Sequence, residues 1–380
     1  MKKLILLVVM GLLVTASGFA QKSNRTKAYL YLEKGQLDKA KEAIDEAVKN
    51  EKTKDDPKTW LFYGEIYYGI SDSPLPAYKK LDTLAAQKAL DALQKVKSLD
   101  QKGHMIKDAN DYIQKLSPVF YKNANKAFKA KNYIGAMNNF GYAYKVGQII
   151  GKTDTTAAFN AGISGLLGHD PKMAAGYLKK SIDDGYEDAK AYIYYSRSLK
   201  EMGDTTAAAA AITEGRKVHP EDLGLLLEQA QMYLEKGQSK ELITSLKEAI
   251  AKEPNSPSNA NLYFLIGKSY DDLHDTAQAE ENYKKSLAIN PNFFLSYYNI
   301  GAIYINKAAK LQKKANSLPL SAQKEYDSIN KEANANLKIA IPWLEKAIKI
   351  KPDDKQTYNA LKEAYTRLKM NDKLKELMNK

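Results

Sequence analysis

Side chains that could perform catalysis are few and scattered in this sequence of 380 residues. Its four histidines are His104, His169, His219 and His274, and no two of them have the spacing of metal ligands. His169 and His274 each follow a predicted helix, which is typical of a turn residue facing solvent. Ser164 stands in a Gly-x-Ser-Gly stretch, but the pattern around it is helical, whereas a nucleophilic serine of this kind needs a strand-to-helix turn. We therefore expect no metal, no cofactor and no enzymatic activity.

The first twenty residues have the pattern of a secretory signal peptide. Lys2 and Lys3 precede an apolar run over residues 4–14, and small residues follow up to Ala20. The run is too short for a permanent membrane span, and no other stretch is apolar over the required length. We expect cleavage after Ala20 and export to the periplasm, an oxidising compartment that the complete lack of cysteine also fits.

Beyond residue 20, a period of about 34 residues organises the chain. Residues 262–291 show two helical faces and a closing proline: Tyr263, Ile266, Gly267 and Tyr270, then Ala279, Tyr283 and Leu287, then Pro291. This spacing resembles the tetratricopeptide repeat, whose signature is W-x2-L-G-x2-Y, then A-x3-F, then P. The small residue lets the two helices approach, the aromatic residues fill the space between repeats, and the proline ends the second helix.

The resemblance implies an all-α fold, a right-handed superhelical solenoid of stacked helix-turn-helix repeats. Copies of this repeat pattern recur in the same register through nearly the whole chain. The prediction therefore rests on many repeats and not on a single amphipathic helix. The last helices, rich in Lys, Asp and Glu, suit a solvated cap. The predicted repeats are 21–54, 57–102, 117–150, 155–188, 189–222, 223–256, 260–293 and 294–353, followed by capping helices over 354–380.

One repeat contains an insertion that keeps helical spacing. Tyr270 and Ala279 are 9 residues apart, whereas the matching Tyr304 and Ala340 are 36 apart, an excess of 27. We expect a two-helix arm over residues 306–337, in which about 13 extra residues per helix add roughly 20 Å. The arm is either tolerated surface decoration or a contact with a partner, and self-association through residues 306–337 stays open.

A second insertion separates Tyr67 from Ala89 by 22 residues instead of 9. It includes Ser-Asp-Ser-Pro-Leu-Pro at residues 71–76, which predicts a loop. We expect this loop to be followed by a lengthened second helix. Like the arm, it is either decoration or a partner contact, because loops on a repeat scaffold are where specificity is commonly added.

The chain is basic, with a formal net charge of +13 that falls to +11 when Lys2 and Lys3 leave with the signal peptide. Acidic residues are interspersed with the basic ones along the predicted helices, which is typical of a solvated outer face. Export argues against nucleic acid as the physiological ligand. An electrostatic adaptor that binds an acidic partner or the anionic envelope surface, through a basic face or the arm, remains the alternative function.

The family resemblance also implies a binding surface, because first-helix residues of such repeats line a concave groove that accepts a peptide or a partner's helix. Asparagine amides can bond a peptide backbone, and Lys or Arg can pair with its carboxylates. The predicted groove residues for a protein or peptide partner are Tyr121, Asn125, Phe128, Asn160, Lys190, Tyr194, Arg197 and Lys268.

Family members that grip the carboxylate end of a chaperone tail use a five-residue clamp, Lys and Asn, then Asn, then Lys and Arg, over three successive repeats. The matching positions here are Tyr121 and Asn125, Asn160, and then Lys190 and Tyr194. Tyrosine replaces the first Lys and the Arg of the clamp. The resemblance therefore favours general peptide binding over recognition of a terminal carboxylate.

Together these features predict a non-enzymatic tetratricopeptide-repeat scaffold that binds a protein or peptide in the bacterial cell envelope. The composition and the stretch GFAQK at residues 18–22 resemble exported repeat proteins of Bacteroidota, which implies a periplasmic location. An enzyme would instead require titratable groups clustered in a pocket, and a purely electrostatic binder would require one continuous basic face.

Overall fold

The computed structural model describes residues 24–379, and every regular element within this range is a helix. The predicted all-α solenoid of stacked helix pairs is confirmed. The chain forms two compact units that divide between Ala211 and Ile212. The predicted signal peptide, residues 1–20, lies outside the described residues. Within residues 24–379, no helix is long and apolar enough to span a membrane.

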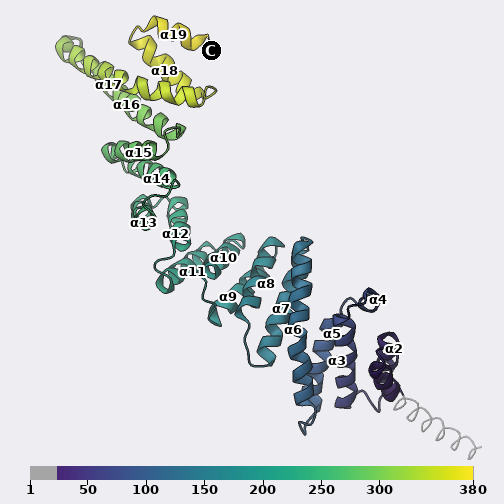
Figure 1. Ribbon diagram of the computed structural model, residues 1–380. Coiled ribbons are helices and arrows are strands. Elements are labelled where there is room, and N and C mark those ends of the chain that lie inside the picture. Colours follow the sequence, from purple (N-terminus) through teal and green to yellow (C-terminus); the bar gives the residue numbers. More distant parts are fainter. Residues whose placement is uncertain (1–23, 380) are drawn as a thin grey trace, which may run out of the picture. The chain divides into compact units, whose positions relative to one another are not determined.

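The first unit consists of helices that pack in consecutive pairs, α3 with α5, α6 with α7 and α8 with α9 (Figure 1). Its first helix covers residues 24–33. The others are α2 (Leu37–Ala47), α3 (Pro57–Asp72), α4 (Pro76–Lys79), α5 (Ala85–Leu99), α6 (Ile106–Lys129), α7 (Tyr133–Ile149), α8 (Thr155–Leu167), α9 (Pro171–Asp183) and α10 (Lys190–Glu201). Helix α11 (Thr205–Val218) contains the division between the units.

The second unit repeats this arrangement, with α12 against α13, α14 against α15, α16 against α17 and α18 against α19. Its helices are α12 (Leu223–Glu235), α13 (Ser239–Lys252), α14 (Asn259–Asp272), α15 (Thr276–Ile289), α16 (Phe294–Asn316), α17 (Gln323–Ile350), α18 (Lys355–Arg367) and α19 (Asn371–Met378).

Local sequence signals set the ends of these helices. Asp275 is the N-cap of α15, where its side chain accepts a hydrogen bond from the backbone N–H of Gln278 at 3.1 Å. Helix α14 ends before His274, which has a φ of 63°, and α8 ends before His169, with a φ of 58°. Both histidines are exposed, so the prediction that they are turn residues facing solvent is confirmed.

The small residue of the repeat signature allows the helices of a pair to approach closely. A Cβ atom added to Gly267 would lie 2.7 Å from the ring of Tyr283, and one added to Gly301 would lie 2.6 Å from Cγ of Leu344. Neither distance is compatible with van der Waals packing. Glycine at these positions therefore makes room for the large side chain of the second helix.

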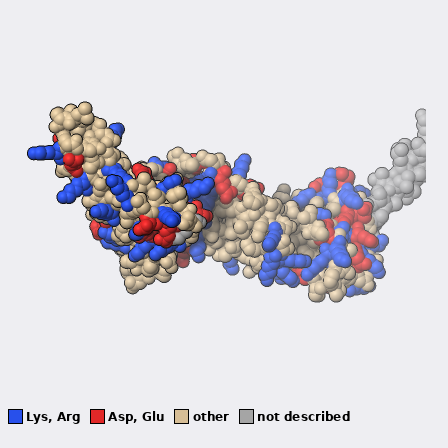
Figure 2. All heavy atoms as spheres, turned by 90° about the horizontal axis from the view of Figure 1, so that it is seen from above, with Lys and Arg blue, Asp and Glu red and all other residues tan. Residues whose placement is uncertain are grey.

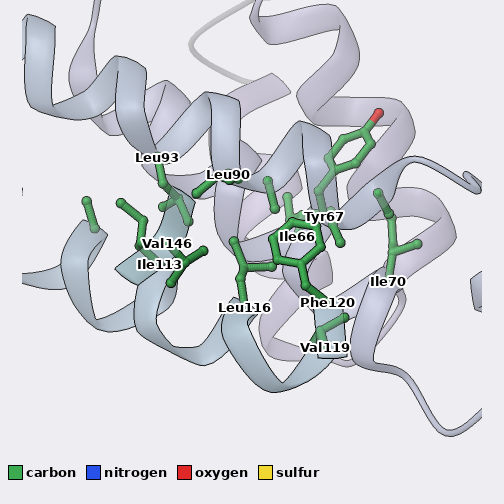
Figure 3. Close-up of a cluster of buried hydrophobic side chains, with 14 of the residues drawn as sticks. Ile66, Tyr67, Ile70, Leu90, Leu93, Ile113, Leu116, Val119, Phe120 and Val146 are labelled. Atoms are coloured by element: carbon green, nitrogen blue, oxygen red, sulfur yellow. The ribbon is translucent and has the colours of Figure 1, made fainter. Parts of the chain in front are cut away.

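Buried side chains from consecutive helices form a continuous core in the first unit (Figure 3). They alternate between first and second helices, so each helix contributes to the core of its own pair and of the next. Those labelled in Figure 3 are Ile66, Tyr67 and Ile70 of α3, Leu90 and Leu93 of α5, Ile113, Leu116, Val119 and Phe120 of α6, and Val146 of α7.

A tyrosine on a first helix recurrently donates a hydrogen bond to a carboxylate on the preceding helix. The hydroxyl lies 2.8 Å from the carboxylate oxygen in three such pairs, Tyr67 with Asp45, Tyr304 with Glu280 and Tyr365 with Glu345. A lysine also contacts each carboxylate, namely Lys41, Lys284 and Lys373 respectively. These pairs link neighbouring repeats at the edge of the core.

The larger insertion forms a helical hairpin from the second half of α16 and the first half of α17. A short 3-10 turn, Leu320–Ala322, joins the two helices, and the hairpin buries small or branched side chains between them. It also contacts α18, because the guanidinium of Arg367 donates to Asn334 at 3.2 Å and to Asn330 at 3.4 Å. The buried residues of the hairpin are Ala308, Ala315, Ile329, Ala333 and Leu337.

The smaller insertion is mostly loop. The loop after α3 contains the one-turn helix α4, and α5 follows with 15 residues, compared with 17 residues in α7 and 14 in α13 and in α15. The hydroxyl of Tyr78 in α4 donates to the backbone carbonyl of Gly35 at 3.0 Å, and Ser73 is buried, so the loop folds back onto the first repeats.

Candidate functional site

Seven of the eight predicted groove residues lie on α6, α8 and α10, all in the first unit. On α6 and α10 they are spaced by four and three residues, so each set shares one face of its helix. We call the surface that these seven residues form the α6–α8–α10 face. Its members are Tyr121, Asn125 and Phe128 on α6, Asn160 on α8, and Lys190, Tyr194 and Arg197 on α10.

Tyr121 connects α6 to the start of α8. Its hydroxyl donates to the carboxylate of Asp154 at 2.8 Å, and the other oxygen of Asp154 caps α8 by accepting from the backbone N–H of Ala157 at 2.9 Å. Burial, reinforced by the Asp154 carboxylate, raises the pKa of the Tyr121 hydroxyl. Tyr121 is half-buried, and its hydrogen bond to Asp154 links two repeats, so only part of its ring is accessible to a ligand.

Aromatic rings connect α8 to α10. The ring of Phe159 stacks on Tyr186 with centroids 4.5 Å apart and lies 6.1 Å from the ring of Tyr194. The guanidinium of Arg197 lies 5.6 Å from the centroid of Tyr194, a cation–π distance. These contacts place an aromatic surface beside the exposed guanidinium of Arg197.

The polar members of the face are available for contact. Asn125 is exposed, and Asn160 is half-buried. Lys190 is exposed, with its ammonium nitrogen 3.7 Å from the carboxylate of Asp188, and a surface pair of this kind contributes little to stability. The face therefore combines amide donors and acceptors with cationic groups on a partly aromatic surface.

The five positions that match the carboxylate clamp lie on α6, α8 and α10. The positions that would need Lys and Arg hold Tyr121 and Tyr194, both of them half-buried in contacts between repeats. The remaining polar set is Asn125, Asn160 and Lys190. A terminal carboxylate would meet one cation from this set, whereas the family clamp supplies three.

Two predicted residues differ in their surroundings from the rest. Lys268 lies on α14 in the second unit, where it forms an ion pair with Asp272, so it is not part of the α6–α8–α10 face. Phe128 is at the end of α6 and packs edge-on against Tyr133, with ring centroids 5.3 Å apart.

Sequence reasoning did not predict that an acidic group at the other end of the same unit would lie close to other carboxylates and have a raised pKa. Burial, and then the nearby carboxylates of Asp108 and Glu33, raise the pKa of Glu65 on α3 to about 7. Beside them Tyr68 and Tyr112 meet edge to face with centroids 5.7 Å apart. Asp108 lies in the first turn of α6, which the predicted repeats had left unassigned, and the helical spacing of residues 108, 112 and 115 was the available signal.

Charge is mixed on the face of the molecule that Figure 2 shows. In the face that Figure 2 shows, Lys and Arg side chains are interspersed with Asp and Glu over most of the molecule. Many lysines form ion pairs within one helix turn, such as Lys285 with Glu281 at 2.8 Å. In the described part of the chain, no three His, Cys, Asp or Glu side chains are grouped in a way that could hold a metal ion.

Comparisons with known proteins agree with the repeat spacing. The tetratricopeptide repeat family matches residues 25–74, 195–260 and 260–293. No curated protein matches the sequence.

Similar solved structures include the MamA protein, with 16% identity over 46% of this chain and 92% of its own and a TM-score of 0.40. Another is YrrB, described as a tetratricopeptide-repeat protein with an unusual peptide-binding site. The match has 16% identity, covers 47% of this chain and 88% of YrrB, and has a TM-score of 0.38. A tetratricopeptide-repeat protein from Bacteroides fragilis has 23% identity, with 66% of this chain and 98% of its own covered, and a TM-score of 0.31. The tetratricopeptide-repeat matches over residues 25–74 and 195–293 fall on helices of the pairs described above.

Proposed function

We propose that this protein is a non-enzymatic scaffold of the bacterial cell envelope that binds a protein or peptide partner on its α6–α8–α10 face. The observation that carries the proposal is the combination, on this face, of exposed Asn125, Lys190 and Arg197 with the aromatic contacts of Phe159 and Tyr194. Tetratricopeptide repeats in the same chain support a role in protein binding.

The chemistry of the face suits an extended segment with acidic side chains. An asparagine amide both donates and accepts, so Asn125 and Asn160 can bond a peptide backbone running across α6 and α8. Lys190 and Arg197 can pair with carboxylates, and the rings beside them can cover apolar side chains. The face would therefore recognise backbone, charge and apolar groups together.

The proposed location rests on the sequence. The basic start, the apolar run over residues 4–14 and the small residues before Ala20 have the pattern of a signal peptide. The lack of cysteine is compatible with an oxidising compartment. Detection of the protein in a periplasmic fraction, with Gln21 as its first residue, would support this part of the proposal.

The binding proposal is tested by crosslinking capture from envelope extracts at moderate and at high salt. The triple variant Asn125→Ala, Asn160→Ala and Lys190→Ala should lose the partner that the wild-type protein captures, while its circular dichroism spectrum and melting temperature stay unchanged. Asn125 and Lys190 are exposed and Asn160 is half-buried, and none of the three belongs to the buried core, so folding should tolerate their removal.

The matched control changes two other asparagines and one other lysine, all exposed: Asn138→Ala, Asn255→Ala and Lys172→Ala. It should capture the partner normally. Equal capture by the wild-type protein and the first triple variant would show that the partner binds elsewhere, and the proposal for this face would be abandoned.

A further inference from the structure

The turn of the helical hairpin presents apolar side chains directly to solvent. Leu320, the first residue of the 3-10 turn, is fully exposed, with 101% of its reference area accessible, and Pro319 beside it is exposed as well. Leu318 is half-buried, and Tyr326, one turn into α17, is 37% exposed. We call these four residues the arm tip. Apolar groups gathered at the end of a protruding element commonly mark a contact with another surface.

A stripe of lysines leads along α16 to the arm tip. Helix α16 contains no Asp or Glu in its 23 residues, whereas Lys307, Lys310 and Lys314 follow one another at spacings of three and four, with Lys313 beside them. Lys314 lies 4.0 Å from Glu325 with both side chains more than half exposed, so this pair is weak.

The other lysines near the tip have their charges largely unmatched. Within residues 24–379, Lys310 and Lys313 have no carboxylate within ion-pair distance. Lys313 lines a shallow hollow with Glu363 and Arg367 of α18 but forms no ion pair with Glu363. Lys310 and Lys313 therefore offer positive charge to a partner without first breaking a salt bridge, and Lys314 has only its weak pair with Glu325 to break.

The size of the apolar surface distinguishes between classes of partner. A stable protein interface covers roughly 800 Å² on each side and has an apolar centre surrounded by a polar rim. The arm tip offers two leucines, one proline and the edge of one tyrosine. An anionic lipid surface needs less, because a shallow insertion of one or two apolar side chains adds to the attraction between lysines and headgroups.

We propose that the arm tip binds an anionic lipid membrane, with Leu318 and Leu320 inserted at the headgroup boundary and the lysines of α16 near the lipid phosphates. The long methylene chains of lysine suit this position, since they can lie along apolar surface while the ammonium group stays among the headgroups. The proposal sharpens the electrostatic alternative expected from the sequence. It concerns the second unit, so it can fail without affecting the α6–α8–α10 face, and the reverse also holds.

The test is flotation of residues 21–380 with vesicles, in a form that omits the apolar run at residues 4–14. Vesicles of phosphatidylcholine with 30% phosphatidylglycerol, an anionic fraction of about one third chosen to attract lysines, should carry the protein, and vesicles of phosphatidylcholine alone should not. Raising the salt from about 0.1 M to 0.5 M should weaken binding, because salt screens the lysines.

Two variants address the two parts of the surface. Leu320→Asp should weaken binding to the anionic vesicles about tenfold or more, because it removes the inserted side chain and adds a repelled charge. The triple change Lys310→Gln, Lys313→Gln and Lys314→Gln should weaken it by about fivefold per lysine. All four side chains are exposed, so the melting temperature should not change.

Matched controls separate a local site from general positive charge. Lys217→Gln, Lys236→Gln and Lys240→Gln remove the same charge from exposed positions on α11 and near the α12–α13 turn, and Leu84→Asp changes another exposed leucine. Both controls should float like the wild-type protein. The proposal is overturned if the wild-type protein does not float with anionic vesicles, or if the controls lose binding as much as the arm variants do. It is also overturned if the arm variants change only the mass measured by light scattering, which would identify the tip as a contact between two copies.

Discussion

The insertion after α3 and the insertion between α16 and α17 enlarge a helix pair in opposite ways. The first folds back as a loop with one helical turn, held by a tyrosine hydroxyl on the backbone of Gly35. The second lengthens both helices of its pair and buries its own stripe of alanines, with Ile329 and Leu337. An insertion with helical spacing brings its own core, whereas one without it depends on hydrogen bonds to the repeats already present.

The helices that lead into the two insertions also differ in charge. Helix α3 carries Glu65, half-buried near two other carboxylates, whereas α16 carries several lysines and contains no Asp or Glu. The first insertion therefore adjoins a region whose stability depends on protonation, and the second adjoins a basic surface.

The hairpin should depend on packing. Leu337→Ala removes a side chain that is 4% exposed and should lower the free energy of unfolding by about 2–4 kcal/mol, because it leaves a cavity between α16 and α17. Urea denaturation followed by circular dichroism measures this change. Leu320→Ala, at the fully exposed tip, is the control and should stay within about 0.5 kcal/mol of wild type. Equal effects of the two changes would show that the hairpin has no packed core of its own.

Helix α3 should make stability depend on pH. The pKa of Glu65 is about 7 in the folded protein, above the usual value of 4.5 for an unfolded chain. The folded state therefore binds more protons between these values, and stability falls as the pH rises from about 4.5 to about 7. Glu65→Gln should match wild type near pH 4.5 and exceed its stability by about 1–2 kcal/mol at pH 8, a figure reduced for partial exposure.

The control for this prediction lies on the hairpin. Glu332→Gln changes an exposed carboxylate of α17, and it should leave the pH dependence of the melting temperature as in wild type. Measuring melting temperatures of the three proteins from pH 4.5 to pH 8 is sufficient. A parallel pH response of wild type and Glu65→Gln would mean that Glu65 is ionised without cost in the folded state.

The loop after α3 should depend on its hydrogen bond to the first repeat. Tyr78→Phe removes the donor that lies 3.0 Å from the carbonyl oxygen of Gly35, and it should cost about 0.5–1 kcal/mol. Tyr326→Phe on the hairpin is the matched change. It should not change the free energy of unfolding measurably. A similar loss of stability in both variants would show that the Tyr78 hydrogen bond does not distinguish the two insertions.

The smallest effect is expected for the ion pair at the hairpin turn. Glu325→Gln removes the partner of Lys314, an exposed pair at 4.0 Å, and it should change the free energy of unfolding by less than about 0.5 kcal/mol. The same urea titration measures it. A loss near 2 kcal/mol would mean that charge contributes to holding the hairpin together as strongly as packing does.

The sequence predicted those parts of the fold that depend on spacing. Helix pairs and the long hairpin follow from apolar residues at helical intervals, which are visible without tertiary information. The one-turn helix α4 and the path of the other insertion were not predicted, because a loop without periodicity is placed by its contacts, here with Gly35. The start of α6 was also missed, because Pro118 within the helix is normally a sign of a helix end, yet α6 continues through it.

The candidate site was predictable only as a set of positions. Register indicates that Asn125 and Lys190 both lie on first helices, but not which neighbouring residues contact each side chain. The hydroxyl of Tyr121 is bonded to Asp154, 33 residues away, and the raised pKa of Glu65 arises from burial and then from carboxylates on two other helices. Such contacts are properties of the stack and are not visible in any single repeat.

The tyrosine–carboxylate pairs between neighbouring helices bear on how the chain folds. They join residues only 22, 24 and 20 positions apart, although the whole sequence has 380. Closing such short loops costs little chain entropy, so the repeats should assemble rapidly from adjacent segments. Each repeat also relies on its neighbours alone, so terminal repeats can open while central ones stay closed. Amide hydrogen exchange should accordingly be fastest in α19 and slower in the helices that have a repeat on either side.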